Sequence, residues 1–313
     1  MKENIKTKLI SWGILIALAL TWGSSFILIK KGLGVFSSQE VGALRIIISF
    51  LVLLPFALAR IKKVRAHEWK YLFIIGAVGS AAPAFLFAIA QTGIDSNLAG
   101  ILNSLTSLFT LLIGLIFFSL KTRWFNVLGV FLGLTGAVGL ISVSGGHSFS
   151  GNIGYSLYVI IATICYAINV NVLKKYLKRL DAFTITSISF MLLGLPLIIY
   201  LLAGTDFYSQ IKTDEKAFEG LLYIGILAVF GTGMALIAFN YLIKISSVIF
   251  SASVTYLIPV VAVFWGIIDG EIFEPAFFIW ILLILMGVFL VNLNYQNRFM
   301  NNLSSYFRRQ KNK

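Results

Sequence analysis

Cysteine and histidine are scarce in this sequence of 313 residues. A single cysteine, Cys165, excludes a disulfide framework and a cysteine-based metal cluster. The two histidines, His67 and His147, fall in expected loops and lack the spacing of a zinc site. Five prolines against 27 glycines exclude a collagen-like or proline-rich chain. We therefore expect no metal and no other cofactor.

Charged residues are also few, at 12% of the chain, whereas apolar residues make up 59%. Soluble domains carry about 25% charged residues, and disordered chains are poor in apolar ones. Both classes are excluded, which leaves a membrane protein. The net charge of +13 would fit a nucleic-acid partner as well as an anionic membrane surface. The positions of the cations in the sequence have to decide between these two partners.

Long apolar runs dominate the sequence. A helix needs about 20 apolar residues to cross the hydrocarbon core, and continuous runs of that length favour helices over outer-membrane strands. Ten such runs are bounded by charged or turn residues, and we expect membrane spans at residues 9–29, 38–59, 69–90, 98–120, 124–144, 154–173, 183–202, 218–242, 248–268 and 277–293. The expected fold class is all-α integral membrane.

The cations gather on one face of these ten spans. With both ends of the chain on the same face, twenty of the 25 lysines and arginines fall there, and nine of the 12 acids fall on the other face. Short loops rich in lysine and arginine stay in the cytoplasm, so both termini are expected inside. We expect a multi-pass protein of the inner (cytoplasmic) membrane, whose basic loops and tail meet anionic lipid rather than nucleic acid.

The spans divide into five plus five around an uncharged loop. Trp22 with Ile29-Lys30-Lys31 matches Tyr166 with Leu173-Lys174-Lys175 at a shift of 144 residues. An odd number of spans in each half inserts the second half upside down, an arrangement typical of secondary transporters. The expected domains are two inverted five-helix repeats and a basic cytoplasmic tail, at residues 1–147, 148–296 and 297–313.

Each half also interrupts one span at a nearly equivalent place. The interruptions are Gly76, Gly79 and Pro83 in the third run, and Gly225, Gly231 and Gly233 in the eighth. In inverted-repeat transporters, interruptions at corresponding points mark the binding region. The alternative is that such glycines only let helices pack closely, as expected for Gly129, Gly133 and Gly136 of the fifth run.

Three stretches resemble the EamA-like branch of the drug/metabolite transporter superfamily. They are Trp22-Gly23-Ser24-Ser25-Phe26, the stretch from Ser253 through Tyr256 to Gly270-Glu271, and Gly287-Val288. The first half departs from the pattern, because Ser107-Leu108 and Leu120-Lys121 stand where such repeats carry proline and a Gly-Glu pair. The resemblance implies transport of small metabolites, often amino acids, through a central cavity lined by spans one, three, four, six, eight and nine.

A polar side chain inside a span costs free energy unless it has a partner or a role. Arg45 is the only ionisable residue well inside an apolar run. We interpret it either as the counter-charge for a carboxylate or phosphate, or as a structural arginine that reaches the outer rim. The candidate substrate-binding residues are Trp22, Ser25, Phe85, Asn103, Tyr166, Asn169, Asn240, Tyr256 and Trp265.

The acids at span ends offer no proton site inside the membrane. Asp95, Asp269 and Glu271 lie at the outer ends of runs, where solvation explains them, and Glu271 is also suited to capping or loop anchoring. The sequence thus favours transport driven by a substrate gradient, or coupling through a residue that the sequence does not identify.

The function we expect is a secondary transporter, with export favoured, that moves small metabolites such as amino acids by alternating access. A channel or facilitator is the alternative within transport. A lipid-modifying membrane enzyme is less favoured because the short loops carry no His/Asp/Glu constellation, and the chain lacks the phosphate-binding loop of an ATP-driven pump. The expected partners are a small-molecule substrate and the lipid bilayer, and monomer and homodimer both stay open.

Overall fold

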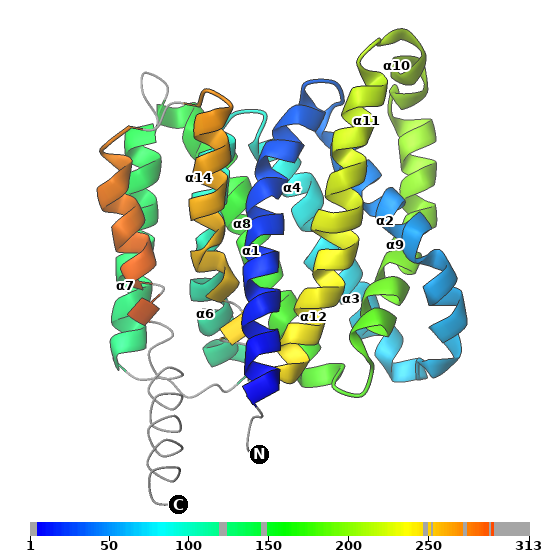
Figure 1. Cartoon of the computed structure of the whole chain (residues 1–313), viewed down its shortest axis with the longest axis horizontal. Coiled ribbons are helices and arrows are strands. Elements are labelled where there is room, and N and C mark those ends of the chain that lie inside the picture. Colours follow the sequence, from blue (N-terminus) through cyan, green and yellow to red (C-terminus); the bar gives the residue numbers. More distant parts are fainter. Residues whose placement is uncertain are drawn as a thin grey trace, which may run out of the picture.

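The computed structural model describes residues 5–118, 124–144, 149–246, 250–251, 253–271, 274–287 and 289–290. Every regular element in these ranges is a helix. Seven described helical stretches are long and apolar enough to cross a membrane, and three shorter apolar helices accompany them. The long helices run side by side in one bundle, as Figure 1 shows. The expected all-α membrane class is confirmed.

The first half of the chain contains four long apolar helical stretches, the first of which lies in α1, and a fifth apolar helix, α7. Its elements are α1 (Ile5–Leu33), α2 (Ser38–Arg60), the 3₁₀ turns η1 (Ile61–Lys63) and η2 (Ala66–Glu68), α3 (Trp69–Gly76), the π-helical segment η3 (Ala77–Ala81), α4 (Ala82–Ala90), α5 (Ser96–Leu102), the 3₁₀ turn η4 (Asn103–Leu105), α6 (Thr106–Phe118) and α7 (Trp124–Ser144).

The second half contains α8 (Phe149–Tyr176), α9 (Ala182–Gly204), α10 (Phe207–Thr213), α11 (Ala217–Ile226), the π-helical segment η5 (Leu227–Met234), α12 (Ala235–Ile245), the 3₁₀ turn η6 (Ser253–Tyr256), α14 (Ile258–Ile268) and the helix Phe277–Gly287. The run expected at 248–268 is divided between η6 and α14. Pro259 explains where α14 begins, because its missing N–H is tolerated only in the first turn of a helix.

Local capping fixes where α2 and α9 begin. The Ser37 backbone N–H donates to Glu40 at 2.8 Å, and the Glu40 N–H donates to the Ser37 hydroxyl at 3.3 Å, so a capping box starts α2. Asp181 caps α9 by accepting a bond of 2.9 Å from the Thr184 N–H. The two capped helices pack against each other, one from each half.

Helices of the two halves interdigitate at the centre of the bundle. α1 packs against α12 and α14 of the second half, and α8 packs against α4 and α6 of the first. α2 pairs with α9, and α5 with α14. The contacts between the first and second halves of the chain therefore lie in the interior of the bundle.

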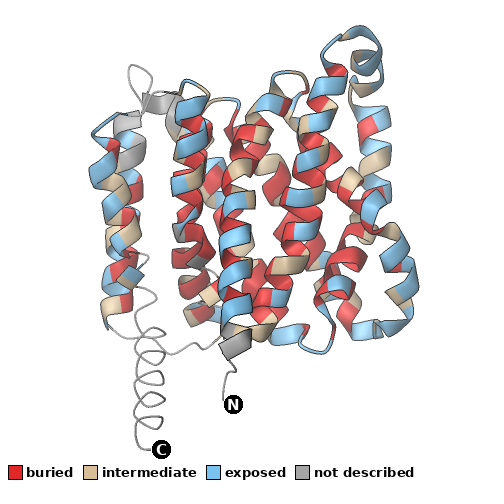
Figure 2. Ribbon diagram, in the orientation of Figure 1, coloured by how far each residue is buried: buried red, intermediate tan, exposed pale blue. Residues whose placement is uncertain are grey.

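Exposure along the helices is arranged as a bilayer would require. Large apolar side chains cover the outer faces, among them Phe117, Phe131, Ile199 and Phe218. Polar side chains such as Ser104 are buried inside. Figure 2 shows the buried surfaces turned toward the middle of the bundle. Lipid tails can cover the apolar faces, whereas the interior polar groups need partners within the protein.

Glycines of α7 bring that helix against the helix Phe277–Gly287. A Cβ at Gly287 would meet backbone atoms of Gly129 and Gly133, and one at Gly136 would lie 2.9 Å from the backbone nitrogen of Ile284. Neither backbone can yield locally, so glycine is required for this approach. The glycines of the fifth run therefore serve helix packing.

Candidate functional site

A cavity lies in the interior where the two halves meet. Its volume is about 70 Å³, enough for a few water molecules. The lining comes from α1, α2, η3, α4, η4, α6, α8, η5, α12, η6 and α14, and includes Trp22, Ser25, Phe26, Ile29, Arg45, Gly79, Ser80, Phe87, Asn103, Thr106, Tyr166, Asn169, Val170, Gly231, Thr232, Leu236, Phe239, Val254, Thr255 and Ile258. These are the six spans that the resemblance implies, with α2 added through Arg45.

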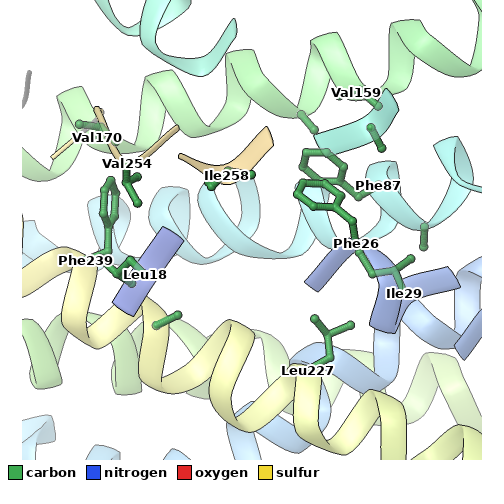
Figure 3. Close-up of a cluster of buried hydrophobic side chains, with 14 of the residues drawn as sticks. Leu18, Phe26, Ile29, Phe87, Val159, Val170, Leu227, Phe239, Val254 and Ile258 are labelled. Carbon is green, nitrogen blue, oxygen red and sulfur yellow. The ribbon is translucent and has the colours of Figure 1, made fainter. Parts of the chain in front are cut away.

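Aromatic and aliphatic side chains form much of the wall. The rings of Phe26 and Phe87 lie 5.5 Å apart between centroids, and those of Trp22 and Phe239 lie 5.0 Å apart. Figure 3 shows Phe26 against Phe87, with Phe239 and Val254 contributed by other helices. Such a wall suits the apolar part of a small molecule.

The two interrupted spans both reach this cavity. The third and eighth runs contain the π-helical segments η3 and η5, at the places where the glycine pattern predicts interruptions. A π-helical turn shifts backbone carbonyls out of the usual ladder, and such turns are frequent at functional sites. Trp22 Nε1 donates to the Gly231 carbonyl at 3.0 Å, and the Ser49 hydroxyl donates to the Ala228 carbonyl at 2.8 Å. The interruption thus supplies acceptors to side chains of the first half.

Gly79 in η3 permits a close approach to α8. A Cβ at this position would overlap the Asn169 side chain, so only glycine lets the two elements lie so near. Gly225 differs, because a Cβ there would meet nothing within 4 Å. Of these two predicted interruption sites, Gly79 shapes the cavity and Gly225 does not.

Arg45 is the charged side chain of the cavity wall. It lies in α2 two turns from the start of the helix and is 6% exposed. Its Nη2 donates to the Thr232 hydroxyl at 3.3 Å, and that hydroxyl donates to the Leu227 carbonyl at 3.1 Å. Nε and Nη1 have no partner among the described residues. The structure therefore places Arg45 in the interior rather than at the outer rim.

Five of the nine candidate binding residues line the cavity together with Arg45. They are Trp22, Ser25, Asn103, Tyr166 and Asn169. The Asn169 side-chain oxygen has no partner among the described residues, whereas the Ser25 hydroxyl donates to the Thr21 carbonyl at 2.9 Å. Their role in binding stays a prediction.

Three other candidates lie outside the cavity lining, in contacts between helices. The Phe85 ring packs near Tyr200, with centroids 6.2 Å apart. Asn240 donates to the Thr186 hydroxyl at 2.9 Å, and Trp265 donates to the Ser24 hydroxyl at 2.8 Å. The side chain of the fourth, Tyr256, is outside the described part of the structure.

The sequence did not single out several lining residues. Phe26 and Ile29 follow Trp22 at helical spacings of four and seven, which places all three on one face and could have identified them. Thr232 lies inside the Gly231-Thr232-Gly233 interruption, which was a second available signal. Phe87 and Phe239 gave none, because an aromatic residue in an apolar run is expected anywhere.

An ion cluster joins the two halves at the C-terminal end of α1. Lys30 contacts Asp269 at 2.7 Å and Glu271 at 2.9 Å, and Lys31 also pairs with Asp269. Glu271 accepts from the Ser96 N–H at 3.0 Å, the Ser96 hydroxyl at 2.6 Å and the Asn97 N–H at 2.9 Å. Its carboxylate thus caps α5, with the side chain 1% exposed.

Gly270 makes this arrangement possible. Its φ of 82° lies in the left-handed region, which glycine adopts readily. The turn leads the chain from the end of α14 back toward α5, and the Glu271 N–H donates to the Gly266 carbonyl at 2.9 Å. The Gly-Glu pair of the sequence therefore builds a turn and a cap, as the capping interpretation of Glu271 expects.

The ion cluster should resist mild acid. Hydrogen bonds from Lys30 and Lys31 lower the pKa of Asp269. Burial alone would raise the pKa of Glu271, but bonds from Ser96, Lys30 and the Asn97 N–H outweigh burial and lower it. A carboxyl with a depressed folded pKa contributes stability above its unfolded pKa, near pH 4, and loses it as the pH falls through the folded pKa. Between pH 8 and roughly pH 5, we expect this cluster to leave the melting temperature nearly constant. At pH values lower than about 4, the melting temperature should decrease.

Thermal scans of the wild type and Asp269→Asn test this pH dependence. The variant should melt lower at neutral pH and lose less stability on acidification, because the titrating carboxyl is gone. Asp95 acts in the opposite direction, since burial and the nearby Glu271 charge raise its pKa, and it is present in both proteins. An identical acid slope in the two proteins would contradict the assignment.

A second cluster joins the halves at the other end. Arg179 Nε donates to Glu68 at 3.0 Å, and Arg179 Nη2 donates to the Lys63 carbonyl at 2.6 Å. The rings of Tyr71 and Tyr176 stack beside it, with centroids 4.2 Å apart. The connection before α3 is thereby bound to the connection after α8.

The lysine that corresponds to Lys30 has different partners. Lys174 donates to the carbonyls of Ile243 at 2.7 Å and Ser246 at 3.3 Å. At a shift of 151, Glu271 corresponds to Leu120, which lies outside the described residues. The departure noted in the first half thus removes the carboxylate that would match Glu271.

Comparison with known proteins accords with this geometry. The sequence matches the EamA-like transporter family over residues 10–142 and again over residues 153–293. This chain belongs to that family. The resemblance read from Trp22 to Phe26 and from Ser253 to Glu271 is therefore confirmed, and this EamA-like protein is a multi-pass transporter of the inner membrane.

Relatives of this EamA-like protein are named as transporters. It is 27% identical over 286 residues to YedA, an uncharacterized inner membrane transporter of Escherichia coli, with 90% of each chain covered. It is 22% identical to a probable terminal-alkyne amino-acid exporter of Streptantibioticus cattleyicolor, covering 90% of this chain and 92% of the exporter. One crystal structure superposes with a TM-score of 0.65 at 17% identity, covering 92% of this chain and 98% of the other, and that likeness shows the fold alone.

Proposed function

We propose that this transporter is a secondary exporter that moves small amphipathic metabolites, such as amino acids, by alternating access. The observation that carries the proposal is the interior cavity, because each half contributes a π-helical segment to its wall. In this proposal, residues 1–147 and 148–296 are inverted five-helix repeats of ten spans in total, with both termini and the tail at 297–313 in the cytoplasm.

Three observations support the inverted repeat. The family matches the chain twice, once in each half. α1 and α8 hold corresponding positions, since each packs on the π-helical segment of the other half. The interruptions that produce those segments occur at equivalent places in the sequence.

Alternating access finds support in the bonds at the two ends of the bundle. Lys30 and Ser96 of the first half meet Glu271 of the second at one end, and Glu68 meets Arg179 at the other. Rocking one half against the other would open one set of bonds while the other set stays closed. Both sets are charged contacts across the junction.

The named exporter among the relatives supports a substrate of amino-acid size. That protein is described as a probable exporter of a terminal-alkyne amino acid, a small molecule with a polar head and an apolar tail. The cavity of the present chain offers both kinds of surface, since Asn103 and Asn169 lie beside Trp22 and Phe239.

Counterflow tests the proposal. The purified protein in liposomes loaded with unlabelled metabolite should accelerate uptake of the labelled compound, with saturation at high concentration. A panel of amino acids and related small acids, amines and alcohols would be screened. Flux that rises linearly without counterflow would favour a channel, and absence of transport for a folded protein across the panel would overturn the proposal.

Two cavity residues should matter for transport. Trp22→Ala removes an aromatic wall and a hydrogen bond to η5, and Asn169→Ala removes a polar group with an unpartnered oxygen. We expect each variant to lower the counterflow rate on the order of tenfold, equivalent to about 1.4 kcal/mol, while purifying in normal yield. Trp124→Ala is the matched control, because that ring is 75% exposed at the start of α7. Wild-type rates in both cavity variants would remove them from the site.

A further inference from the structure

The guanidinium of Arg45 is a buried charge without a counter-ion in the described structure. It is 6% exposed, and its one described hydrogen bond goes to a neutral hydroxyl of Thr232. The described ion pairs all involve other residues. No aspartate or glutamate occurs among the residues that line the cavity. The cavity wall therefore carries one positive charge and no described negative one.

A buried arginine without a counter-ion lowers the stability of the protein, so a purely structural role does not explain Arg45. Arginine stays protonated at any accessible pH, and an unpaired charge away from water is strongly disfavoured. A structural arginine would be expected to find a carboxylate or several carbonyls. Here Nε and Nη1 are buried without described partners on a side chain that lines a cavity, and in this proposal a ligand supplies the missing acceptor once the site opens.

We propose that, among the small amphipathic metabolites proposed above, the substrate is an organic acid with a single carboxylate and no positive charge rather than an amino acid, and that Arg45 binds this carboxylate. The proposal rests on the transport function proposed above. One guanidinium balances one carboxylate, and its planar N–H groups suit the two carboxylate oxygens. The wall offers no second cation for a phosphate dianion and no carboxylate for an ammonium group, among its described residues.

The other residues of the cavity wall indicate what the rest of the substrate contains. Phe26, Phe87 and Phe239 favour a short apolar body, and in this proposal the cavity of about 70 Å³ widens to hold it as the two halves move. The unpartnered Asn169 side-chain oxygen accepts one hydrogen bond, which a hydroxyl on the substrate can donate. A branched 2-hydroxy acid has all three features. Its amino-acid analogue carries an ammonium group instead and leaves the site with a net positive charge.

Three matched probes separate these possibilities in counterflow: 2-hydroxy-4-methylpentanoate, leucine and 3-methylbutylamine. The hydroxy acid and leucine share one carbon skeleton, the amine is leucine without its carboxyl group, and the three differ in net charge. The hydroxy acid should be exchanged about tenfold faster than leucine, and the amine should not be exchanged. Faster exchange of leucine or of the amine would overturn the anionic substrate class while leaving transport intact. No counterflow of any compound across the wider panel would instead overturn the transport function.

Substitution of Arg45 tests the residue itself. Arg45→Met removes the charge and keeps the length of the side chain, and it should lower counterflow of the hydroxy acid by about 30-fold or more. Arg45→Lys keeps the charge without the planar donors and should retain part of the activity. Arg60→Met on the same helix is the matched control and should behave as the wild type. Wild-type counterflow in Arg45→Met would overturn the assignment.

A binding measurement keeps the proposal testable if Arg45→Met fails to fold. In the wild-type protein, 2-hydroxy-4-methylpentanoate should raise the melting temperature in detergent, and 3-methylbutylamine at the same concentration should not. An uncompensated charge destabilises the empty protein, so a folded Arg45→Met should melt at an equal or higher temperature and lose the shift caused by the acid. An equal shift by acid and amine would overturn the role of the guanidinium.

Discussion

Glu271→Ala is expected to destabilise the transporter strongly, although the residue lies outside the cavity. The carboxylate accepts hydrogen bonds from the Ser96 N–H and hydroxyl, from the Asn97 N–H and from Lys30. Alanine leaves the first two N–H groups of α5 without this cap, and leaves Lys30 with Asp269 alone. These losses fall on groups that connect α1, α5 and the end of α14.

The expected size follows from the burial of the carboxylate. Removing one partner of a buried pair costs about 3–5 kcal/mol. Lys30 keeps a second acid and its side chain is 35% exposed, so water screens part of the loss. We therefore expect about 3 kcal/mol, most of it from the lost cap and the desolvated donors. For a chain of this size, that corresponds to a melting temperature lower by roughly 5 °C.

Thermal unfolding of the purified variants in one detergent measures this effect. Glu271→Gln keeps an acceptor oxygen without the charge and should fall between alanine and the wild type. Glu274→Ala is the control, because that side chain is exposed and lies three residues further along the same connection. Equal melting temperatures for Glu271→Ala and Glu274→Ala would show that the cap and the ion cluster contribute little.

Gly79→Ala is expected to impair transport far more than its size suggests. The added methyl group would overlap the Asn169 side chain, so either Asn169 must rotate or α8 must move away from η3. Overpacking of this kind costs about 1–3 kcal/mol. Because Asn169 lines the cavity, displacement of its amide changes the binding surface directly. We expect counterflow to fall on the order of tenfold or more, with a moderate loss of stability.

Gly225→Ala provides a matched control for this prediction. Gly225 belongs to the other interrupted span, but a Cβ there would meet nothing within 4 Å. Alanine at that position should leave transport unchanged and stabilise α11 by about 0.5–1 kcal/mol. Similar effects of the two substitutions would mean that flexibility of the interrupted spans matters, rather than the fit of Gly79 against Asn169.

The double variant Gly79→Ala, Asn169→Ala separates packing from chemistry. Removing the amide takes away the two closest atoms, Cγ and Oδ1, whereas the Cβ of residue 169 stays 2.8 Å from the added methyl group. Stability should therefore recover in part relative to Gly79→Ala, with a measurable coupling between the two sites. Transport should stay low, because the polar group is still missing. Recovery of transport along with stability would show that Asn169 is dispensable and that Gly79→Ala acts only by distorting the bundle.

Local features of the chain were readable from the sequence because they depend on near neighbours. Of the ten predicted runs, seven contain described helices long and apolar enough to cross a membrane, and the other three contain shorter apolar helices, so the ten spans stay a prediction. The glycine and proline pattern in the third and eighth runs predicted interruptions, and π-helical segments occur there. The capping role of Glu271 was also among the interpretations, since a carboxylate after a Gly turn at a span end is suited to that task.

The orientation of each helix about its own axis was harder to predict. Phe85 was a candidate for the cavity wall, but it packs near Tyr200, and Phe87, two residues later, lines the cavity instead. Residues two apart on a helix point in nearly opposite directions, so choosing between them requires knowing which neighbour each face meets. A run that is apolar all round gives no such direction.

The sequence by itself determined the membrane class, the apolar helical runs and the places where two of them break, because the bilayer and the backbone impose those patterns on consecutive residues. Only the tertiary structure decided what Arg45 faces. Its position in an apolar run allowed either a rim or an interior location, and the answer came from Thr232, which is 187 residues away along the chain. The role of a buried charge depends on the groups around it. Here those groups come from segments far apart in the sequence, and the packing of the two halves brings them together.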